Sequence, residues 1–359
     1  MLDKGYTTER KKLTFGLRTL ITIGAIVVVI LGMILVMRIV GKNHLSKAIA
    51  GEVSANIGES KDDISENQIF YNGKVYELNE DIISILIMGI DSETVEDIGG
   101  QSWSVSEDSQ YAGGQADTLF LAIINPHTKK VSFLAVNRNT MATVDVWDEA
   151  GNYKGTQIQQ IALQHGYGDG KEESCERQVK AVSRLLFDIP INSYAAISMD
   201  GVPKLNDAVG GVSVTVLDDI VYPEYDMNLH EGQQTTLKGE KAYWYVRLRN
   251  ENVFNSNEQR QNRQRQYLSA FIAKAKEEVL SDARVAADLY KVIDEYMVTD
   301  IDLSEFTYMA TEYVGYDFEL DNIYALEGEV VQGKVFEEFY MDEASAEELI
   351  VDLFYEEVN

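Results

Sequence analysis

The sequence predicts an α/β fold in which helices flank a mixed central sheet and one transmembrane helix precedes the folded body. Short runs rich in Ile, Leu and Val at residues 82–88, 118–124 and 131–136 are typical of strands buried on both faces. Segments with helical apolar spacing are mixed with these strands, as in layered α/β proteins. The uncharged run 19–37 is long enough to cross a bilayer as a helix.

The amino-terminal region predicts a cytoplasmic tail at 1–18, a membrane anchor at 19–41 and a polar extracytoplasmic stalk at 42–80, followed by the body at 81–359. More cations precede the apolar run than follow it, which favours a cytoplasmic amino terminus. We therefore expect a single-pass protein of the cell membrane with its body outside the cell. A cleaved signal peptide is the alternative, although the run is longer than the apolar core of such peptides.

The body is expected to begin with the three buried strands, of which the second and third form a hairpin through the turn at Asn125-Pro126. Helical spacing follows at 158–165 and 177–187, then a strand at 194–197, a helix at 200–209 and a strand at 212–216. A strand-like run at 243–249 precedes helices at 259–279, 282–296, 304–313 and 344–355.

The composition is strongly acidic, with 31 Lys and Arg against 59 Asp and Glu. A duplex-binding protein needs a broad cationic surface, so nucleic acid is excluded as a partner. Cys175 is the only cysteine, and no intramolecular disulfide can form. We expect Cys175 to pack inside the fold on a helix.

Five of the scarce cations lie between Arg247 and Arg265. If 243–249 is a strand, Arg247 and Arg249 point the same way. The residues Arg260, Arg263, Gln264 and Tyr267 then follow at helical spacing and share one face. A guanidinium group binds phosphate oxygens through two hydrogen bonds and keeps its charge. The spacing therefore predicts an anion site, with a solvated helix as the alternative.

Two aspartates lie at ends of the first two strands, Asp91 after the first and Asp117 before the second. If these strands are antiparallel neighbours, the two carboxylates meet at one edge of the sheet, where a divalent cation could link them to a phosphate. Arg138, just after the third strand, could reach the same edge. The alternative is that both aspartates only form turns.

Six motifs, taken in order, resemble the LytR-CpsA-Psr family of bacterial envelope proteins. They are Ile-Met-Gly-Ile-Asp91, Ala-Asp117-Thr118, Val-Asn-Arg138-Asn-Thr140, Asp200-Gly201 with Leu205 through Gly211, Gly239-Glu240-Lys241-Ala242 with Tyr245-Val-Arg247-Leu-Arg249, and Arg260-Gln-Asn-Arg263-Gln264. The resemblance covers about 81–274 and extends more loosely to the carboxyl end.

The resemblance implies an α/β/α sandwich that transfers a glycopolymer, such as teichoic acid or capsule, from a polyprenyl pyrophosphate carrier to peptidoglycan through a phosphodiester bond. It implies that Asp91 and Asp117 hold magnesium and that Asp117, Arg138 and Arg249 are catalytic. The pyrophosphate-binding residues implied by it are Arg138, Arg247, Arg249, Arg260, Arg263 and Gln264. An apolar slot between sheet and helices is implied for the lipid.

Two positions depart from the family pattern, because Asn139 and Asn257 stand where aspartates are usual. Asparagine can orient an arginine but cannot accept a proton. The leading hypothesis is a magnesium-dependent phosphotransferase whose partners are the lipid-linked glycan, peptidoglycan and the membrane. The alternatives are a polyprenyl pyrophosphate hydrolase and a binder that senses the lipid-linked precursor without turnover.

Overall fold

The computed structural model describes residues 35–51, 57–58, 64–91, 113–148, 150–249, 256–282, 284–313, 315–318, 322–334 and 336–358. The chain divides into two compact units, Met1–Leu45 with Asp302–Val314, and Ser46–Ile301 with Gly315–Asn359. Among the described residues, none of the helices is both long enough and apolar enough to span a bilayer. Most of the anchor predicted at 19–41 lies outside the described residues.

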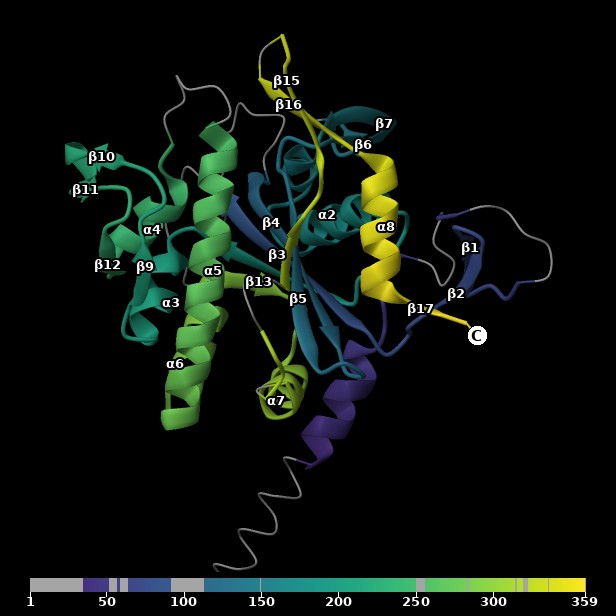
Figure 1. Cartoon of the computed structure of the whole chain (residues 1–359), viewed down its shortest axis with the longest axis horizontal. Helices are drawn as coiled ribbons and strands as arrows, with labels where there is room; N and C mark the ends of the chain where they lie inside the picture. Colours follow the sequence, from purple (N-terminus) through teal and green to yellow (C-terminus); the bar gives the residue numbers. More distant parts are fainter. Residues whose placement is uncertain are drawn as a thin grey trace, which may run out of the picture. The chain divides into compact units, whose positions relative to one another are not determined.

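The larger unit contains most of the secondary structure (Figure 1). Its strands are β1 Gln68–Tyr71, β2 Lys74–Leu78, β3 Ile83–Asp91, β4 Gln115–Asn125, β5 Lys130–Val136, β6 Met141–Trp147, β7 Tyr153–Gln160, β8 Ser193–Ser198, β9 Val212–Thr215, β10 Ile220–Tyr222, β11 Met227–Leu229, β12 Gln234–Leu237, β13 Met297–Thr299, β14 Ile323–Ala325, β15 Gly328–Gln332, β16 Glu337–Met341 and β17 Tyr355–Glu357. Its helices are α2 Glu172–Leu185, α3 Gly201–Ala208, α4 Glu240–Arg247, α5 Ser256–Ser281, α6 Arg284–Tyr296 and α8 Glu343–Phe354, with short 3₁₀ turns at Ile161–Leu163, His165–Tyr167 and Pro223–Tyr225.

The central sheet has six strands in the order β13-β8-β3-β4-β5-β14. β4 pairs antiparallel with both β3 and β5, whereas β8 pairs parallel with β3 and β14 pairs parallel with β5. The predicted mixed sheet and the predicted hairpin of the second and third strands are therefore confirmed. Helices α2 and α8 lie on one side of this sheet and α5 and α6 on the other (Figure 1).

Two hydrophobic cores hold the larger unit together. In the first core, Leu86 and Leu121 on one face of the sheet pack with Val179 of α2 and Ile350 of α8. The second core lies around β9 to β12, α3 and α4, and includes the fully buried Tyr245. Residues of α5 pack against the second core. The sheet and the α4–α5 region thus have separate apolar interiors.

Two predicted elements are wrong. Residues 158–165 do not form a helix, because β7 continues to Gln160 in antiparallel pairing with β6 and two 3₁₀ turns follow. Residues 243–249 do not form a strand, because α4 occupies Glu240–Arg247. Tyr, Trp and Val favour strands when nothing else decides, but here contacts from α5 to the carboxyl end of α4 decide.

Part of the region predicted as a stalk belongs to the folded body. β1 and β2 form a hairpin, and β17 near the carboxyl end pairs antiparallel with β2. Ile69 and Leu78 from this hairpin are buried in the first core. The body of the larger unit therefore includes residues ahead of Asp81.

The smaller unit contains a helix at residues 35–45 and α7, Leu303–Glu312. Asp302 caps α7, because its side chain accepts hydrogen bonds from the backbone N–H groups of Ser304 and Glu305, and Glu305 binds the Asp302 backbone in return. An ion pair joins Arg38 to Glu312. A side chain at Gly41 would collide with the backbone of Ser304, so glycine is required there.

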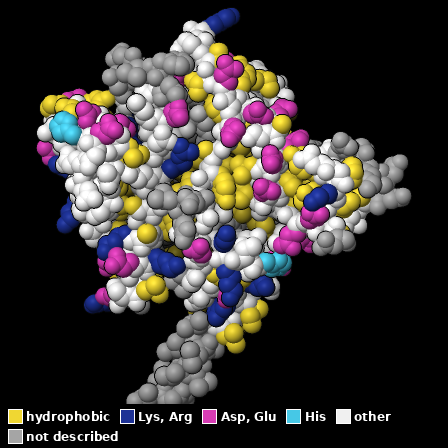
Figure 2. Space-filling model, viewed as in Figure 1, with side chains coloured by type: hydrophobic (Ala, Val, Ile, Leu, Met, Phe, Trp, Pro, Cys, Tyr) yellow, Lys and Arg dark blue, Asp and Glu magenta, His cyan; other side chains and the backbone are white. Residues whose placement is uncertain are grey.

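The surface reflects the acidic composition. Figure 2 shows acidic side chains scattered over one face of the molecule and hydrophobic side chains gathered between α5 and α8. A contiguous apolar area on a surface commonly marks a site of interaction.

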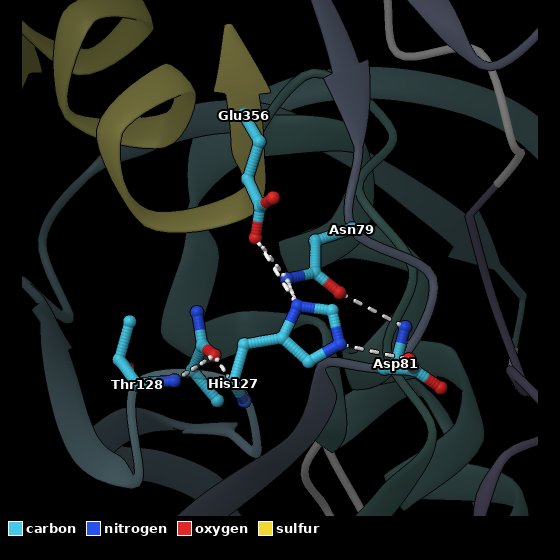
Figure 3. Close-up of polar contacts among 6 residues, drawn as sticks. Asn79, Asp81, His127, Thr128 and Glu356 are labelled. Carbon is cyan, nitrogen blue, oxygen red and sulfur yellow. Dashed lines mark hydrogen bonds and ion pairs between the residues drawn. The ribbon is translucent and has the colours of Figure 1, made fainter.

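A polar cluster around His127 ties β17 to the turn between β4 and β5 (Figure 3). His127 Nε2 lies 3.0 Å from Asp81 Oδ2, and its Nδ1 lies 3.3 Å from Glu356 Oε1. Asn79 Nδ2 donates to the same oxygen of Glu356 at 2.8 Å. The hydrogen bond to Asp81, and then that to Glu356, raise the pKa of His127 above its usual value.

Candidate active site

A β-bulge positions Asp117. Gly89 of β3 pairs with Thr118 of β4, but the next residue, Ile90, pairs with Ala116, so Asp117 has no partner on β3. A bulge redirects the side chain of the extra residue and is common beside active sites. Asp91 closes β3 opposite Gln115, and its side chain lies outside the described part of the chain.

Arg138 faces Asp117 from the turn after β5. The two side chains form an ion pair in which each is only 15% exposed. Arg138 Nη2 also donates to Gln115 Oε1 at 2.6 Å. Its Nε is buried and has no acceptor among the described residues. Arg138 is therefore held firmly by β4, while one of its guanidinium donors is left unsatisfied within the described part of the chain.

Arg260 reaches the same carboxylate from the first turns of α5. Its Nη1 lies 4.0 Å from Asp117 Oδ2, and its Nε, like that of Arg138, is buried without an acceptor in the described structure. Burial lowers the pKa of Arg260 to about 10, and the charges of Arg138 and Arg249 act in the same direction, while Asp117 opposes them. A bound anion would relieve this desolvation and repulsion.

Of the two departures from the family pattern, Asn257 orients an arginine through its side chain, whereas Asn139 makes a backbone contact. Asn257 Oδ1 accepts a hydrogen bond from Arg260 Nη2 at 2.8 Å, and Asn257 Nδ2 donates to Asn137 Oδ1 at 3.2 Å. Asn257 therefore fixes Arg260 against the turn that carries Arg138. Asn139 is buried in this turn, and its carbonyl accepts from the backbone N–H of Phe339 in β16 at 2.9 Å.

Arg249 follows α4 and completes the cluster. It lines a cavity of about 1050 Å³ together with Arg138 and Gln115. The charges of Arg138 and Arg249, and that of Arg263, all act on Arg260, so Arg260 lies within electrostatic reach of each of them. We call Asp117, Arg138, Arg249 and Arg260 the arginine cluster.

Arg263 and Gln264 do not face the cluster, contrary to the predicted helical stripe. Arg263 Nη1 donates to the carbonyl of Tyr245 at 2.5 Å, Nη2 donates to that of Leu248, and Nε lies 3.3 Å from Asp218. Gln264 Nε2 donates to the carbonyl of Val246 at 3.1 Å. These side chains donate to the carbonyls at the end of α4 that have no partner within the helix, and they thereby fix the position of the residues that precede Arg249.

Arg247 also differs from its predicted placement. Because α4 is helical, Arg247 lies beside Tyr243 one turn earlier, donating to its hydroxyl with the guanidinium carbon 5.3 Å from the ring centre. The shared strand face predicted for Arg247 and Arg249 does not exist. Tyr267 Oη donates to Asn206 Oδ1 at 3.1 Å, which turns it toward α3.

A buried histidine that the sequence did not single out supports the strand beneath the cluster. His165 Nδ1 donates to the carbonyl of Gly113 at 2.8 Å, and Nε2 lies 3.8 Å from Cys175 Sγ. Burial lowers the pKa of His165 to about 4, so its ring is neutral at pH 7. Cys175 is buried on α2, as predicted, and burial raises the pKa of its thiol.

Two glycines allow this contact. A Cβ atom at Gly113 would lie 2.4 Å from the carbonyl oxygen of His165, and Gly114 has φ of 75°. The next residue is Gln115, which binds Arg138. The imidazole thus supports Arg138 through the start of β4.

The donor set can be compared with what magnesium requires. Magnesium prefers oxygen ligands and is commonly held by one or two carboxylates together with substrate phosphates. Asp117 supplies a carboxylate, although Arg138 contacts one oxygen and Arg260 approaches the other. No cluster of three or more His, Cys, Asp or Glu suited to a metal occurs in the described segments. The carboxylate of Asp117 is a ligand of the type that magnesium prefers, and phosphate oxygens of a substrate would supply the further ligands.

The chain is also similar to known proteins. A profile of the LytR_cpsA_psr family matches residues 46–350. The chain is 28% identical over 236 residues to a polyisoprenyl-teichoic acid–peptidoglycan teichoic acid transferase TagU of Halalkalibacterium halodurans, covering 66% of each protein. It is 28% identical over 267 residues to Biofilm regulatory protein A of Streptococcus mutans, covering 72% of this chain and 59% of that protein.

A solved structure supports the fold. The crystal structure of B. subtilis TagV superimposes with a TM-score of 0.57 at 24% identity and covers 76% of this chain and 95% of that one. At this identity the likeness concerns the fold alone. The profile match spans most of the chain, and the protein therefore belongs to the LytR_cpsA_psr family.

Proposed function

We propose that the protein is a phosphotransferase that moves a glycopolymer from a polyprenyl pyrophosphate carrier to peptidoglycan and leaves a phosphodiester bond. The observation that carries the proposal is the arginine cluster, in which Arg138 and Arg260 flank the Asp117 carboxylate and Arg249 lines the adjoining cavity. Two of them keep a buried Nε without an acceptor in the described structure. A diphosphate supplies both the charge and the acceptors that this arrangement lacks.

We propose that the lipid packs against the apolar face of the sheet opposite the first core, whose residues are buried in this structure. On β4, Phe120 and Ala122 alternate with residues of the first core and so face the other way. Their neighbours across the sheet, Ile85 and Phe133, are apolar and buried as well. This face begins at Thr118, next to Asp117, so a pyrophosphate at the cluster would place its polyprenyl chain along it.

In the proposed reaction, Arg138, Arg249 and Arg260 bind the diphosphate oxygens and stabilise the charge that develops on them. A hydroxyl group of peptidoglycan attacks the phosphorus that carries the glycan. The bond from this phosphorus to the bridging oxygen breaks, and polyprenyl phosphate leaves with the bonding electrons. The hydroxyl proton passes to water, because Asp117, the nearest described carboxylate, would hold the metal ion and would then be a weak base.

Magnesium is proposed as the cofactor. Asp117, with Asp91 at the end of β3, would hold the ion. When bound, magnesium supplies further neutralisation of charge on the diphosphate. We further propose that residues 19–41 anchor the chain in the cell membrane with its amino terminus in the cytoplasm, which would place the cluster outside the cell beside its lipid-linked substrate.

The proposal is tested by Arg138→Ala and Arg249→Ala in full-length protein supplied with radiolabelled lipid-linked glycan and peptidoglycan. Each variant should transfer label about 10²-fold more slowly, the usual cost of removing one preorganised donor to a developing charge. Arg284→Ala is the matched control, because Arg284 is 88% exposed and pairs only locally with Asp282.

Undiminished transfer in both cluster variants would refute the assignment. The same assay without peptidoglycan identifies the reaction type. Release of polyprenyl phosphate at the same rate would indicate a hydrolase, and tight binding without release under either condition would indicate a binder.

A further inference from the structure

A groove extends from the arginine cluster between two β-hairpins. One wall is the β6–β7 hairpin and the other is the β15–β16 hairpin, while Arg138 and Arg249 line the end nearest the cluster. Its volume is about 1050 Å³, enough for several sugar rings. We call this cavity the hairpin groove.

The two walls are joined by hydrogen bonds. Gln160 Nε2 of β7 donates to the carbonyl of Glu337 in β16 at 2.8 Å. The backbone N–H of Phe339 in β16 donates to the carbonyl of Asn139 at 2.9 Å. The groove is therefore built on paired strands that are attached to the turn carrying Arg138.

The lining of the hairpin groove suits a carbohydrate. Ile158 and Phe336 both line it and are 63% and 67% exposed, which is unusual for large apolar side chains without a partner surface. Gln159 and Gln332 provide amide groups beside them. Apolar surfaces for the C–H faces of sugar rings, together with amides for hydroxyl and acetamido groups, match an amino-sugar polymer.

The position of the groove relative to the bound phosphates indicates whether it would hold the donor glycan or the acceptor glycan. Ala135, on the apolar sheet face, and Asn137 line a separate cavity, whereas Arg138 and Asn139 line the hairpin groove. The turn 137–139 thus lies between that cavity and the groove. Attacking and leaving oxygens lie roughly in line during phosphoryl transfer. If the polyprenyl phosphate leaves along the sheet face, the acceptor must approach from the groove.

We propose that the hairpin groove binds the glycan strand of the peptidoglycan acceptor, with Phe336 and Ile158 as its sugar-contacting residues. This inference rests on the proposed function. Lys334 at the tip of the β15–β16 hairpin is the only cation after Asp300 and also lines the groove. Glu337 and Glu338 line the same groove, so Lys334 does not make the lining cationic, which suits the uncharged N-acetyl sugars of a glycan strand.

The test measures acceptor binding without turnover. Fluorescent glycan strands, prepared from peptidoglycan with the peptides removed, are titrated into the full-length protein and into Phe336→Ala. Loss of one aromatic contact should weaken binding about fivefold to tenfold. Leu280→Ala is the matched control, because Leu280 is also 67% exposed and does not line the groove. Both changes are at exposed positions and should leave folding intact.

Donor binding is measured in parallel with a polyprenyl pyrophosphate-linked disaccharide. Weaker acceptor binding with unchanged donor binding in Phe336→Ala supports the proposal. Acceptor binding equal to that of the control overturns the proposal and shows that the groove does not bind the acceptor. Loss of donor binding instead also overturns it and shows that the groove binds the donor glycan. Failure of the wild-type protein to bind donor at all would refute the proposed function, independently of the acceptor result.

Discussion

Mild acidification should weaken the fold through one buried imidazole, that of His165. The ring donates to Gly113 and lies against Cys175, and burial holds its pKa at about 4. In the unfolded chain a histidine has a pKa of about 6.5. The folded-state pKa is the lower one, so the stability that the neutral ring contributes is complete above pH 6.5 and is lost as the pH falls toward 4.

The size of the effect follows from the two pKa values. Between pH 6.5 and the folded pKa, the unfolded state binds one proton that the native state does not, which costs about 1.4 kcal/mol per pH unit. At pH 5 the free energy of unfolding should therefore be lower by roughly 2 kcal/mol than at pH 7.5 from this residue alone. Work at pH 5 also stays above the sequence pI of about 4.4, where solubility is poorest.

The measurement is urea unfolding at pH 7.5, 6.5, 5.5 and 5 for the wild-type protein and His165→Asn. The asparagine amide can donate to Gly113 in place of Nδ1 but does not titrate. The variant is less stable at every pH because it loses ring packing, but its stability should decline less steeply than that of the wild type. Equal slopes for the two proteins would show that the imidazole does not remain neutral in the native state.

His127→Gln should show the opposite pH dependence, because Asp81 and Glu356 raise the pKa of His127. The contribution of His127 to the stability of the fold is present below the unfolded pKa of about 6.5 and is lost as the pH rises through the folded pKa. The melting temperature of this variant should fall below that of the wild type at pH 6 and match it at pH 9, and a deficit of equal size at both pH values would contradict the proposed ion pairs. Arg263→Ala should lower the free energy of unfolding by about 3 kcal/mol, because it leaves two carbonyls without their donor and removes the ion pair with the partly exposed Asp218. Urea unfolding measures this cost, and a midpoint equal to that of the wild type would show that the buried contacts of Arg263 carry no stability.

The sequence was informative where burial is continuous. The strands β3, β4 and β5 consist of apolar runs longer than chance produces, and their antiparallel order places Asp117 and Arg138 at one edge as predicted. The spacing of α5 also placed Arg260 correctly. These features depend on local periodicity and on the pairing of adjacent strands, and both can be read from neighbouring residues.

The sequence misled where distant contacts decide. The aromatic run in α4 favours a strand, and only the donors of Arg263 and Gln264 on α5 show why it is helical. The same contacts show why these two residues, although in phase with Arg260, face away from the cluster. His165 gave no signal, because its partner Gly113 lies 52 residues earlier and forms a backbone contact. Helical spacing predicts which side chains project from the same face, but it does not predict which groups the end of each side chain contacts.

The arginine cluster takes its members from regions with separate apolar interiors. Asp117 lies in the sheet that rests on the first core and Arg138 follows its strand β5, whereas Arg249 follows α4 and Arg260 lies in α5, and these two helices pack with the second core. Regions of a protein can open with their own free energies. A small displacement of one core relative to the other would separate the charged groups of the arginine cluster while both cores stayed folded. The proposed transfer activity should consequently be lost on heating at a lower temperature than the circular dichroism signal, and activity would be the more sensitive measure of this loosening.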